Sequence, residues 1–206
     1  MNPALIMTRR ILQLFVGLFF YGFAIALMVR AAIGVAPWDV LSQGLVKQTG
    51  IPFGVITVII SGVVLLLWIP IRQKPGIGTV FNAFLVGPFV EVGLFLLPTP
   101  GDLLGKILFF AGGLALLAIA TGLYIGARFG PGPRDGLMTG IHNRYGVRIW
   151  IVRTCIEVVV LSIGWILGGN VGIGTLAFAL LIGPMVNVTI PFLRVPEPMR
   201  PKVVTP

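Results

Sequence analysis

Six polar side chains stand inside long apolar stretches of the sequence, where they could bind a proton or a small polar ligand. They are Thr57, Ser61, Glu91, Arg153, Glu157 and Asn187. Arg153 and Glu157 lie four residues apart, so a helix would place them on one face and allow an ion pair. An ionisable group in apolar surroundings persists only where it faces water or a partner. We therefore expect these side chains to line one central polar cavity. The alternative is a structural ion pair that only fixes the register of the helices.

The polar positions belong to a repeat that runs through most of the chain. Residues 34–88 recur as residues 130–184, at a constant spacing of 96 and without insertion. The matched residues are Gly34, Pro37 and Asp39 with Gly130, Pro133 and Asp135, Gly-Ile-Gly-Thr at 76–79 with the same residues at 172–175, and Gly87-Pro88 with Gly183-Pro184. The polar positions pair as Thr57 with Arg153, Ser61 with Glu157 and Glu91 with Asn187. A repeat of this length indicates a membrane protein made of two equivalent halves.

The composition excludes several classes of protein. Of 206 residues, 57% are hydrophobic and only 10% are charged, too few to cover a soluble domain of this size. The net charge of +9 does not indicate nucleic-acid binding, because the basic residues stand between apolar runs and form no known binding motif. With one His and one Cys, Cys155, we expect no intramolecular disulfide, no metal site and no cofactor.

Six apolar runs are long enough to cross a bilayer, which takes about 20 helical residues. They lie near 10–31, 52–71, 79–97, 104–126, 149–168 and 175–193. The first repeat, 1–98, and the second, 104–193, hold three spans each. Because three is an odd number, the second half must enter the membrane from the opposite face. The sequence therefore predicts an all-α integral membrane protein with six transmembrane helices in a 3+3 inverted repeat.

Two shorter segments, 37–48 and 133–144, are too short to span a bilayer. In each, the repeated proline suits the first turn of a helix, and the repeated aspartate suits the positive end of its dipole. Gly50 and Gly146 suit the ends of these helices. We predict two half-helices, either interfacial or re-entrant.

The basic residues also predict the orientation. Eleven Lys and Arg residues fall on the side of the N-terminus and three on the other side, which places both termini in the cytoplasm. The segment 194–206, rich in proline and basic residues, is expected to be a disordered cytoplasmic tail.

Two repeated motifs predict local features of the spans. Pro88 and Pro184 should kink the third and sixth spans and free a backbone carbonyl that must face protein or a wet cavity; the alternative is a kink that only improves packing. The two Gly-Ile-Gly-Thr segments lack the lysine of a phosphate loop. We expect each to form a tight turn, with the threonine capping the following span.

The motif blocks resemble those of the bacterial YczE-type integral membrane proteins, which are grouped with YitT-like proteins. The resemblance rests on the run from Gly34 to Leu41, on Gly130 to Met138 with Pro133-Arg134-Asp135-Gly136, and on both Gly-Ile-Gly-Thr turns. It covers residues 10–193 and implies a multi-pass protein of the bacterial plasma membrane. It carries over no functional residue, so the site assignments rest on the residues alone.

The leading functional hypothesis is a small secondary transporter for a small polar metabolite or ion. Glu91 or Glu157 would take up a coupling proton, and Arg153 would tune that group or bind the substrate. A second hypothesis is a non-transporting partner that assembles with another membrane protein or with a second copy. A third, an interfacial enzyme, would use Asp135 and His142, but a basic loop that sets the topology explains those residues better, so we expect no enzyme.

Overall fold

The computed structural model describes residues 3–196, and the regular structure of this part is entirely helical. Its helices are α1 (Pro3–Ala31), α2 (Pro37–Thr49), α3 (Phe53–Leu66), α4 (Trp68–Ile71), α5 (Ile77–Leu96), α6 (Leu103–Gly126), α7 (Pro133–Tyr145), α8 (Ile149–Ile166) and α9 (Ile173–Leu193). By length and composition, α1, α5, α6, α8, α9 and the combined segment of α3 and α4 could each cross a membrane. The predicted all-α architecture with six spans is confirmed.

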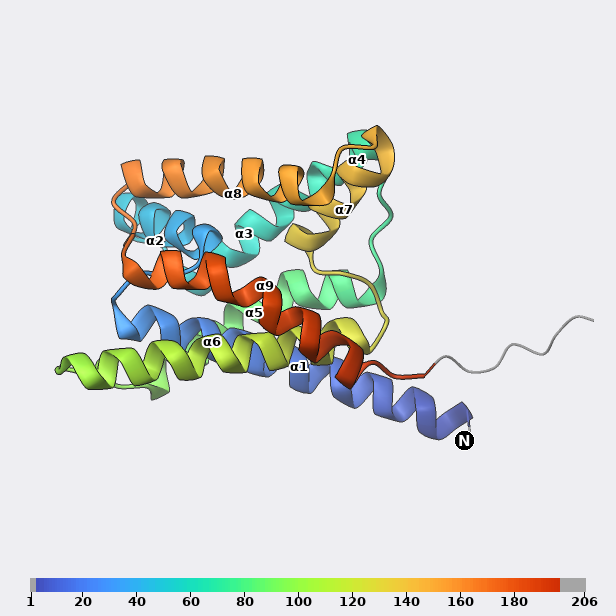
Figure 1. Ribbon diagram of the computed structural model, residues 1–206, viewed down its shortest axis with the longest axis horizontal. Helices are drawn as coiled ribbons and strands as arrows, with labels where there is room; N and C mark the ends of the chain where they lie inside the picture. The colour runs from blue at the N-terminus through green and yellow to red at the C-terminus, as the bar shows by residue number, and fades with distance from the viewer. Residues whose placement is uncertain (1–2, 197–206) are drawn as a thin grey trace, which may run out of the picture.

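The short helices α2 and α7 match the two predicted half-helices to within one residue. Each begins with a proline and ends at a glycine in the left-handed conformation, Gly50 at φ 71° and Gly146 at φ 70°. In Figure 1, α2 and α7 lie at opposite ends of the bundle, and α1 begins at the same end where α9 finishes. This arrangement is the one that an inverted repeat requires; the inversion itself stays a prediction.

The long helices form an arc around the half-helices. In one direction α1 packs against α6, and α6 against α9; in the other, α1 packs against α5, and α5 against α3. The half-helix α2 connects this arc to α8, because it packs against both α3 and α8. The other half-helix, α7, packs against α3, α4, α5 and α8. Between α8 and α9 the described residues form no comparable packing. Among the described residues, the bundle therefore lacks direct packing at the seam between α8 and α9.

Each Gly-Ile-Gly-Thr turn holds the loop that precedes the half-helix of the other repeat. The Gly78 N–H donates to Phe129 O at 2.9 Å, and the equivalent Gly174 N–H donates to Ile33 O at 2.8 Å. This reciprocal exchange ties the two halves together at both ends of the bundle.

The threonines of these turns cap the helices that follow, as the sequence predicts. Thr79 Oγ1 accepts from the Gly76 N–H at 3.1 Å, and Thr175 Oγ1 accepts from the Gly172 N–H at 3.4 Å. The Thr79 hydroxyl also donates to Pro131 O at 2.7 Å. The cap thus joins the start of α5 to the loop before α7.

The two loop glycines, Gly34 and Gly130, should not tolerate alanine. Their φ angles are +112° and +117°, a region that an L residue rarely adopts, and a Cβ on Gly34 would lie 2.8 Å from Thr175 N. We expect Gly34→Ala and Gly130→Ala each to lower the free energy of unfolding by about 1–3 kcal/mol. Thermal unfolding of the detergent-solubilised protein checks this. Gly62→Ala, in a helix with open space around it, is the control and should melt at or above the wild-type temperature. Equal melting of all three variants would show that the loops are not held as described.

The two equivalent seams of the repeats differ. At the α3–α5 seam, the Gly87 Cα faces Gly54 O so closely that a Cβ would overlap that oxygen. At the α8–α9 seam, the equivalent residues are Gly183, with no atom within 4 Å of a built Cβ, and Trp150. Because Trp150 replaces Gly54, α8 cannot approach α9 by the same backbone contact.

The predicted disordered tail begins inside the described part of the chain. Val195 is buried, and its N–H donates to Gly126 O at 3.0 Å, so residues 194–196 continue along α6 and do not begin a disordered segment. Residues 197–206, the remainder of the predicted tail, lie outside the described residues.

Candidate functional site

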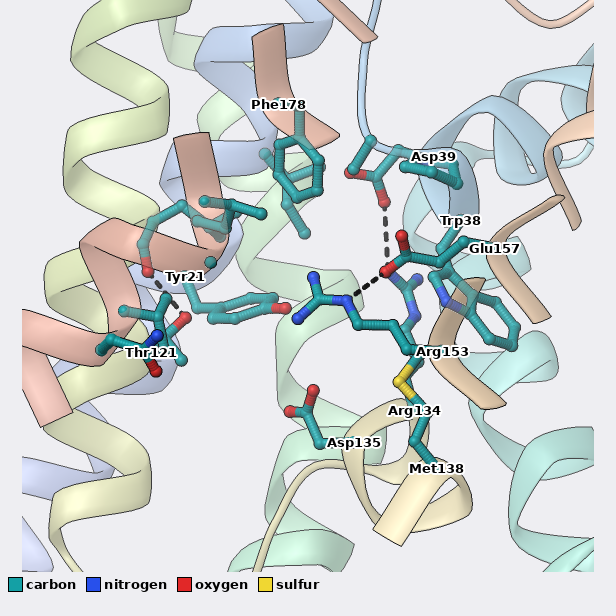
Figure 2. A pocket seen from close by; sticks show the side chains of 18 residues that line it. Tyr21, Trp38, Asp39, Thr121, Arg134, Asp135, Met138, Arg153, Glu157 and Phe178 are labelled. Carbon is teal, nitrogen blue, oxygen red and sulfur yellow. Dashed lines mark hydrogen bonds and ion pairs between the residues drawn. The ribbon is translucent and has the colours of Figure 1, made fainter. Parts of the chain in front are cut away.

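The first turns of α2 and α7 meet at a polar cavity of about 220 Å³ in the middle of the bundle (Figure 2). Its polar lining residues are Tyr21, Trp38, Asp39, Thr121, Arg134, Asp135, Arg153, Glu157 and Asn187. These residues come from α1, α2, α6, α7, α8 and α9, and so from both repeats. The first turns of both half-helices lie inside the bundle, and this brings the charges together.

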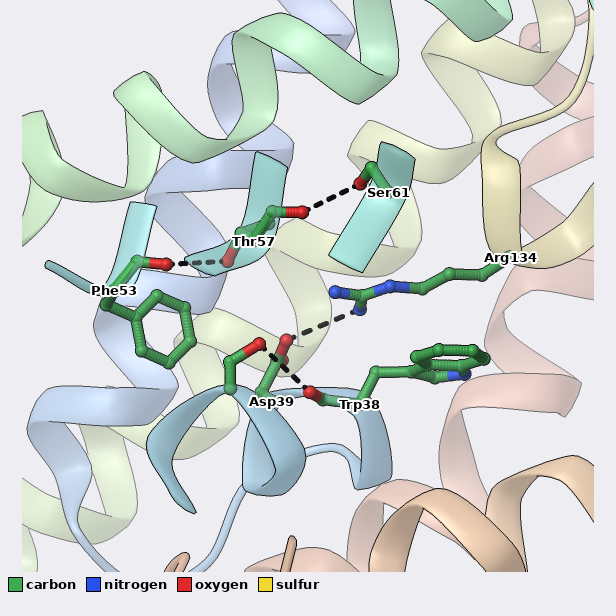
Figure 3. Close-up of polar contacts among 7 residues, drawn as sticks. Trp38, Asp39, Phe53, Thr57, Ser61 and Arg134 are labelled. Atoms are coloured by element: carbon green, nitrogen blue, oxygen red, sulfur yellow. Dashed lines mark hydrogen bonds and ion pairs between the residues drawn. The ribbon is translucent and has the colours of Figure 1, made fainter. Parts of the chain in front are cut away.

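An ion pair joins the two half-helices. Asp39 Oδ1 lies 3.4 Å from Arg134 Nη1, and the Asp39 side chain is only 2% exposed. The Arg134 guanidinium also packs over the Trp38 ring, 5.2 Å from its centroid (Figure 3). The buried Asp39 carboxylate thus has its cationic partner on the other repeat, which links α2 to α7 at the cavity.

Asp135, the repeat equivalent of Asp39, has a different environment. Its Oδ2 accepts a hydrogen bond of 2.5 Å from the Tyr124 hydroxyl. The Tyr124 ring in turn packs edge-on against Tyr21, with 5.6 Å between the centroids. Among the described residues Asp135 has no ion-pair partner. Its carboxylate is therefore the one in the cavity that is held by a hydroxyl and not by a guanidinium.

The predicted ion pair within α8 is present. Arg153 Nε lies 2.8 Å from Glu157 Oε1, and the two side chains are 44% and 19% exposed. The Nη1 and Nη2 atoms of Arg153 make no hydrogen bond to the described residues. In Figure 2 they point away from Glu157, toward the side of the cavity where Tyr21 lies. Arg153 therefore presents unused hydrogen-bond donors to the cavity.

Three of the six predicted site residues, Arg153, Glu157 and Asn187, line this cavity together with the half-helix residues Pro37, Asp39, Arg134 and Asp135. Thr57 and Ser61 line a separate space of only about 20 Å³ beside Asp135. Their hydroxyls donate to Phe53 O and Thr57 O within α3, at 3.0 and 2.9 Å (Figure 3). They are thus satisfied locally and lie next to the cavity, not in its wall.

The expectation that Glu91 lines the central cavity is corrected by the structure. Glu91 lies at the α3–α5 seam, where its Oε1 accepts a hydrogen bond of 2.6 Å from the Gly54 N–H. That N–H belongs to the first turn of α3, which has no intrahelical acceptor for it. The close packing of α5 on Gly54 therefore draws Glu91 into a capping contact, away from Arg153 and Glu157.

The prolines Pro88 and Pro184 lie inside the uninterrupted helices α5 and α9, so they do not end these spans. Neither lines the cavity, although Gly183 does. The predicted exposure of freed carbonyls to a wet cavity stays a prediction.

Sequence reasoning missed several residues of the cavity wall, above all Tyr21, Trp38 and Thr121. The sequence signal is a position that is polar in both repeats, and Tyr21 is paired with Leu117. Both of these residues line the cavity, so equivalent positions do meet there even where their chemistry differs. Within the described residues, no group of His, Cys, Asp or Glu is gathered as a metal site would need.

The chain is similar to several proteins. A family model described as a family of unknown function (DUF6198) matches residues 8–191. An uncharacterized protein of Haemophilus influenzae is 38% identical over 166 residues, 81% of this chain and 76% of its own length. Two Bacillus subtilis proteins match as well. The uncharacterized membrane protein YczE is 32% identical, covering 86% of this chain and 83% of its own. The uncharacterized protein YyaS is 30% identical, with coverages of 87% and 91%.

No solved structure matches the chain. The match of the family model over nearly the whole sequence, together with the relative that is itself a membrane protein, agrees with the six apolar helices and the resemblance seen in the motif blocks. The protein is a bacterial-type multi-pass membrane protein that belongs to the DUF6198 family.

Proposed function

We propose that the protein is a small secondary transporter that binds a polar solute in the central cavity and couples its movement to protons. The observation that carries this proposal is the meeting of two half-helix first turns at a charged cavity inside an apolar bundle. Discontinuous helices whose ends meet near the middle of the membrane are a recurrent way to build a carrier site. A charged group deep in the membrane costs free energy, and such groups usually mark functional sites.

The position of the half-helices also supports access from two sides. α2 reaches the cavity from one end of the bundle, and α7 reaches it from the other (Figure 1). A small displacement of α2 would open the cavity toward one face of the membrane, and a displacement of α7 toward the other. The Asp39–Arg134 pair, which bridges the two helices, would have to loosen when either helix moves. Alternating access therefore has a physical basis in the two re-entrant elements.

Two carboxylates of the cavity are placed to carry the coupling proton. Asp135 is held by the Tyr124 hydroxyl without a cation, and Glu157 shares its charge with the half-exposed Arg153. Protonation of either would remove a negative charge from the cavity and change its affinity for the solute. Protonation of Asp39 would in addition weaken the ion pair with Arg134 that joins the two half-helices, so Asp39 is not used in the test.

Transport in proteoliposomes under an inward proton gradient tests the proposal. A panel of radiolabelled small metabolites and ions is offered outside, and a pH-sensitive dye inside follows the protons. We expect accumulation of a solute together with acidification, reduced by at least about tenfold in Asp135→Asn and Glu157→Gln, since proton coupling needs the titrating group. Asp102→Asn is the control, because Asp102 is an exposed helix cap of α6 that asparagine can replace. No gradient-driven flux of any solute by the folded protein, or unchanged flux in both cavity variants, would overturn it.

The alternative of a non-transporting membrane partner rests on the poor coverage of α8 and α9, which are the least buried of the six spans. The glycines of α6, whose small size could admit a partner helix, are used inside the chain. A Cβ on Gly122 would lie 2.8 Å from Thr189 O, and one on Gly126 would lie 2.7 Å from Leu193 O. Replacing them would therefore disturb the packing of α6 on α9. Co-purification of a partner in fixed stoichiometry, with no flux, would favour this alternative.

The geometry gives the enzyme alternative no support. The His142 ring nitrogen Nδ1 lies 2.7 Å from Val147 O, near the far end of α7, whereas Asp135 is at its first turn against Tyr124. The two side chains that such an enzyme would use are therefore engaged at different ends of α7.

A further inference from the structure

A second cavity of about 530 Å³ lies between α8 and α9, along the seam that the bundle leaves open. Its lining residues are Pro37, Trp150, Arg153, Thr154, Glu157, Val158, Leu161, Val171, Gly172, Thr175, Leu176, Ala179 and Gly183. Four of them, Pro37, Arg153, Glu157 and Gly183, also line the central cavity. The outer groove between α8 and α9 is therefore a mostly apolar passage that ends at the Arg153–Glu157 pair. Its volume lies within the range of small-molecule sites, about 300–1,000 Å³.

The opening is built into the sequence. The equivalent α3–α5 seam closes through the contact of Gly87 with Gly54 and through the hydrogen bond from Gly54 to Glu91. At α8–α9 the residue equivalent to Gly54 is Trp150, whose side chain is 61% exposed and forms part of the groove wall. A large aromatic side chain prevents the backbone approach that two glycines allow. The groove should thus persist in the membrane and be filled from the lipid side.

Residues with unused hydrogen-bond donors line the central cavity, and one of them, Arg153, also lines the groove. Arg153 Nη1 and Nη2 and the Tyr21 hydroxyl make no hydrogen bond to the described residues. The Trp38 Nε1 atom, on a side chain that is 8% exposed, is buried without a partner. The cavity carboxylates, by contrast, are engaged. Asp39 faces Arg134, Asp135 faces Tyr124 and Glu157 faces Arg153. Unpaired donors call for a ligand that carries hydrogen-bond acceptors, and the guanidinium among them favours an anion, because it binds carboxylate and phosphate through two parallel N–H groups.

We propose that the groove and the central cavity form one site for a single-chain amphiphile with an anionic head, a carboxylate or a phosphate. The head binds Arg153 Nη1 and Nη2, and the apolar chain lies in the groove between α8 and α9. The ligand enters sideways from the bilayer through the open seam. This inference rests on the proposed function in using the same cavity, and it adds an anionic amphiphile to the ligands that this cavity would take.

Binding to the purified full-length protein in phosphatidylcholine nanodiscs tests this inference without a gradient. The probe is dodecanoate brominated at its terminal carbon, which quenches nearby tryptophans; Trp150 lines the groove and Trp38 the cavity. We expect saturable quenching that unbrominated dodecanoate reverses and dodecyltrimethylammonium does not. Dodecyl phosphate in parallel tells whether the head is carboxylate-specific or any anion. Because no transport is measured, the site can be found even if the protein carries nothing, and flux of small solutes can be found even if this site is empty.

Two variants test where the anionic head and the apolar tail of the ligand bind. Arg153→Gln should weaken binding of dodecanoate at least about tenfold, the loss expected for a charged hydrogen bond. Ala179→Phe should fill the groove and abolish saturable quenching. Leu180→Phe, on the neighbouring, 65% exposed position outside both cavities, is the matched control and should bind as wild type.

Three results would overturn the inference. The first is equal competition by the cationic amphiphile, and the second is unchanged affinity in both Arg153→Gln and Ala179→Phe. The third is a wild-type dimer in the nanodisc that binds no probe and separates into monomers in Ala179→Phe, because the groove would then be an interface between two copies.

Discussion

Replacing Arg134 by methionine is expected to lower the free energy of unfolding by about 3–5 kcal/mol, the usual cost of breaking a buried ion pair. Methionine keeps much of the packing of the side chain against Trp38 but removes the charge that faces Asp39. The Asp39 carboxylate, 2% exposed, would then be left without its cation. Thermal unfolding in detergent, with size-exclusion chromatography to monitor the folded protein, measures the loss of stability.

A second substitution distinguishes the loss of the Asp39–Arg134 ion pair from the loss of side-chain packing. In the double variant Asp39→Asn with Arg134→Met no charge is left unpaired, so most of the lost stability should return. Arg148→Met, at an exposed position, should stay within about 0.5 kcal/mol of the wild type. If Arg134→Met melts like Arg148→Met, the ion pair between the half-helices does not hold the fold together.

Alanine at Gly87 and at Gly183 is expected to have opposite effects, although the two glycines are repeat equivalents. A Cβ on Gly87 overlaps Gly54 O, so Gly87→Ala must push α5 away from α3 and should cost about 1–3 kcal/mol. It should also strain the hydrogen bond from Gly54 to Glu91. Gly183→Ala meets open space and should be neutral, or stabilise the helix by up to about 1 kcal/mol.

The comparison reports directly on the difference between the two seams. Melting temperatures of the two variants, measured side by side, suffice. Equal destabilisation by both would mean that the α8–α9 seam is closed in the dominant state, and with it the proposed entry from the bilayer would fail.

Most of the fold follows from local physical chemistry. Apolar length locates the six spans, and the pattern of proline at the start and glycine at the end locates α2 and α7. The observed bounds differ from the predicted ones by three residues or fewer, except that α1 begins at Pro3 and not near residue 10. The burial of the first turns of α2 and α7 inside the bundle could not be predicted, because it depends on contacts such as Gly174 N–H with Ile33 O, made between distant parts of the chain.

The site could be predicted only in part, and for the same reason. The spacing of Arg153 and Glu157 is enough to predict their ion pair, which forms within one helix. The pairing of Asp39 with Arg134 joins two repeats and has no local signal. Glu91 was misplaced because repeat symmetry was assumed to hold for surroundings as well as for backbone. The replacement of Gly54 by Trp150 breaks that symmetry and leaves Glu91 at a closed seam.

We infer that α2 and α7 enter the bundle from opposite faces of the membrane and meet at the cavity. Single cysteines at the equivalent positions Gln48 and Arg144, near the exposed ends of these helices, test it most directly in a Cys155→Ser background. A membrane-impermeant maleimide is applied to intact spheroplasts and to lysed ones. We expect Gln48→Cys to react in both preparations and Arg144→Cys to react only after lysis, since the basic residues predict that the end of α7 lies in the cytoplasm. Reaction of both cysteines from the same side would contradict it.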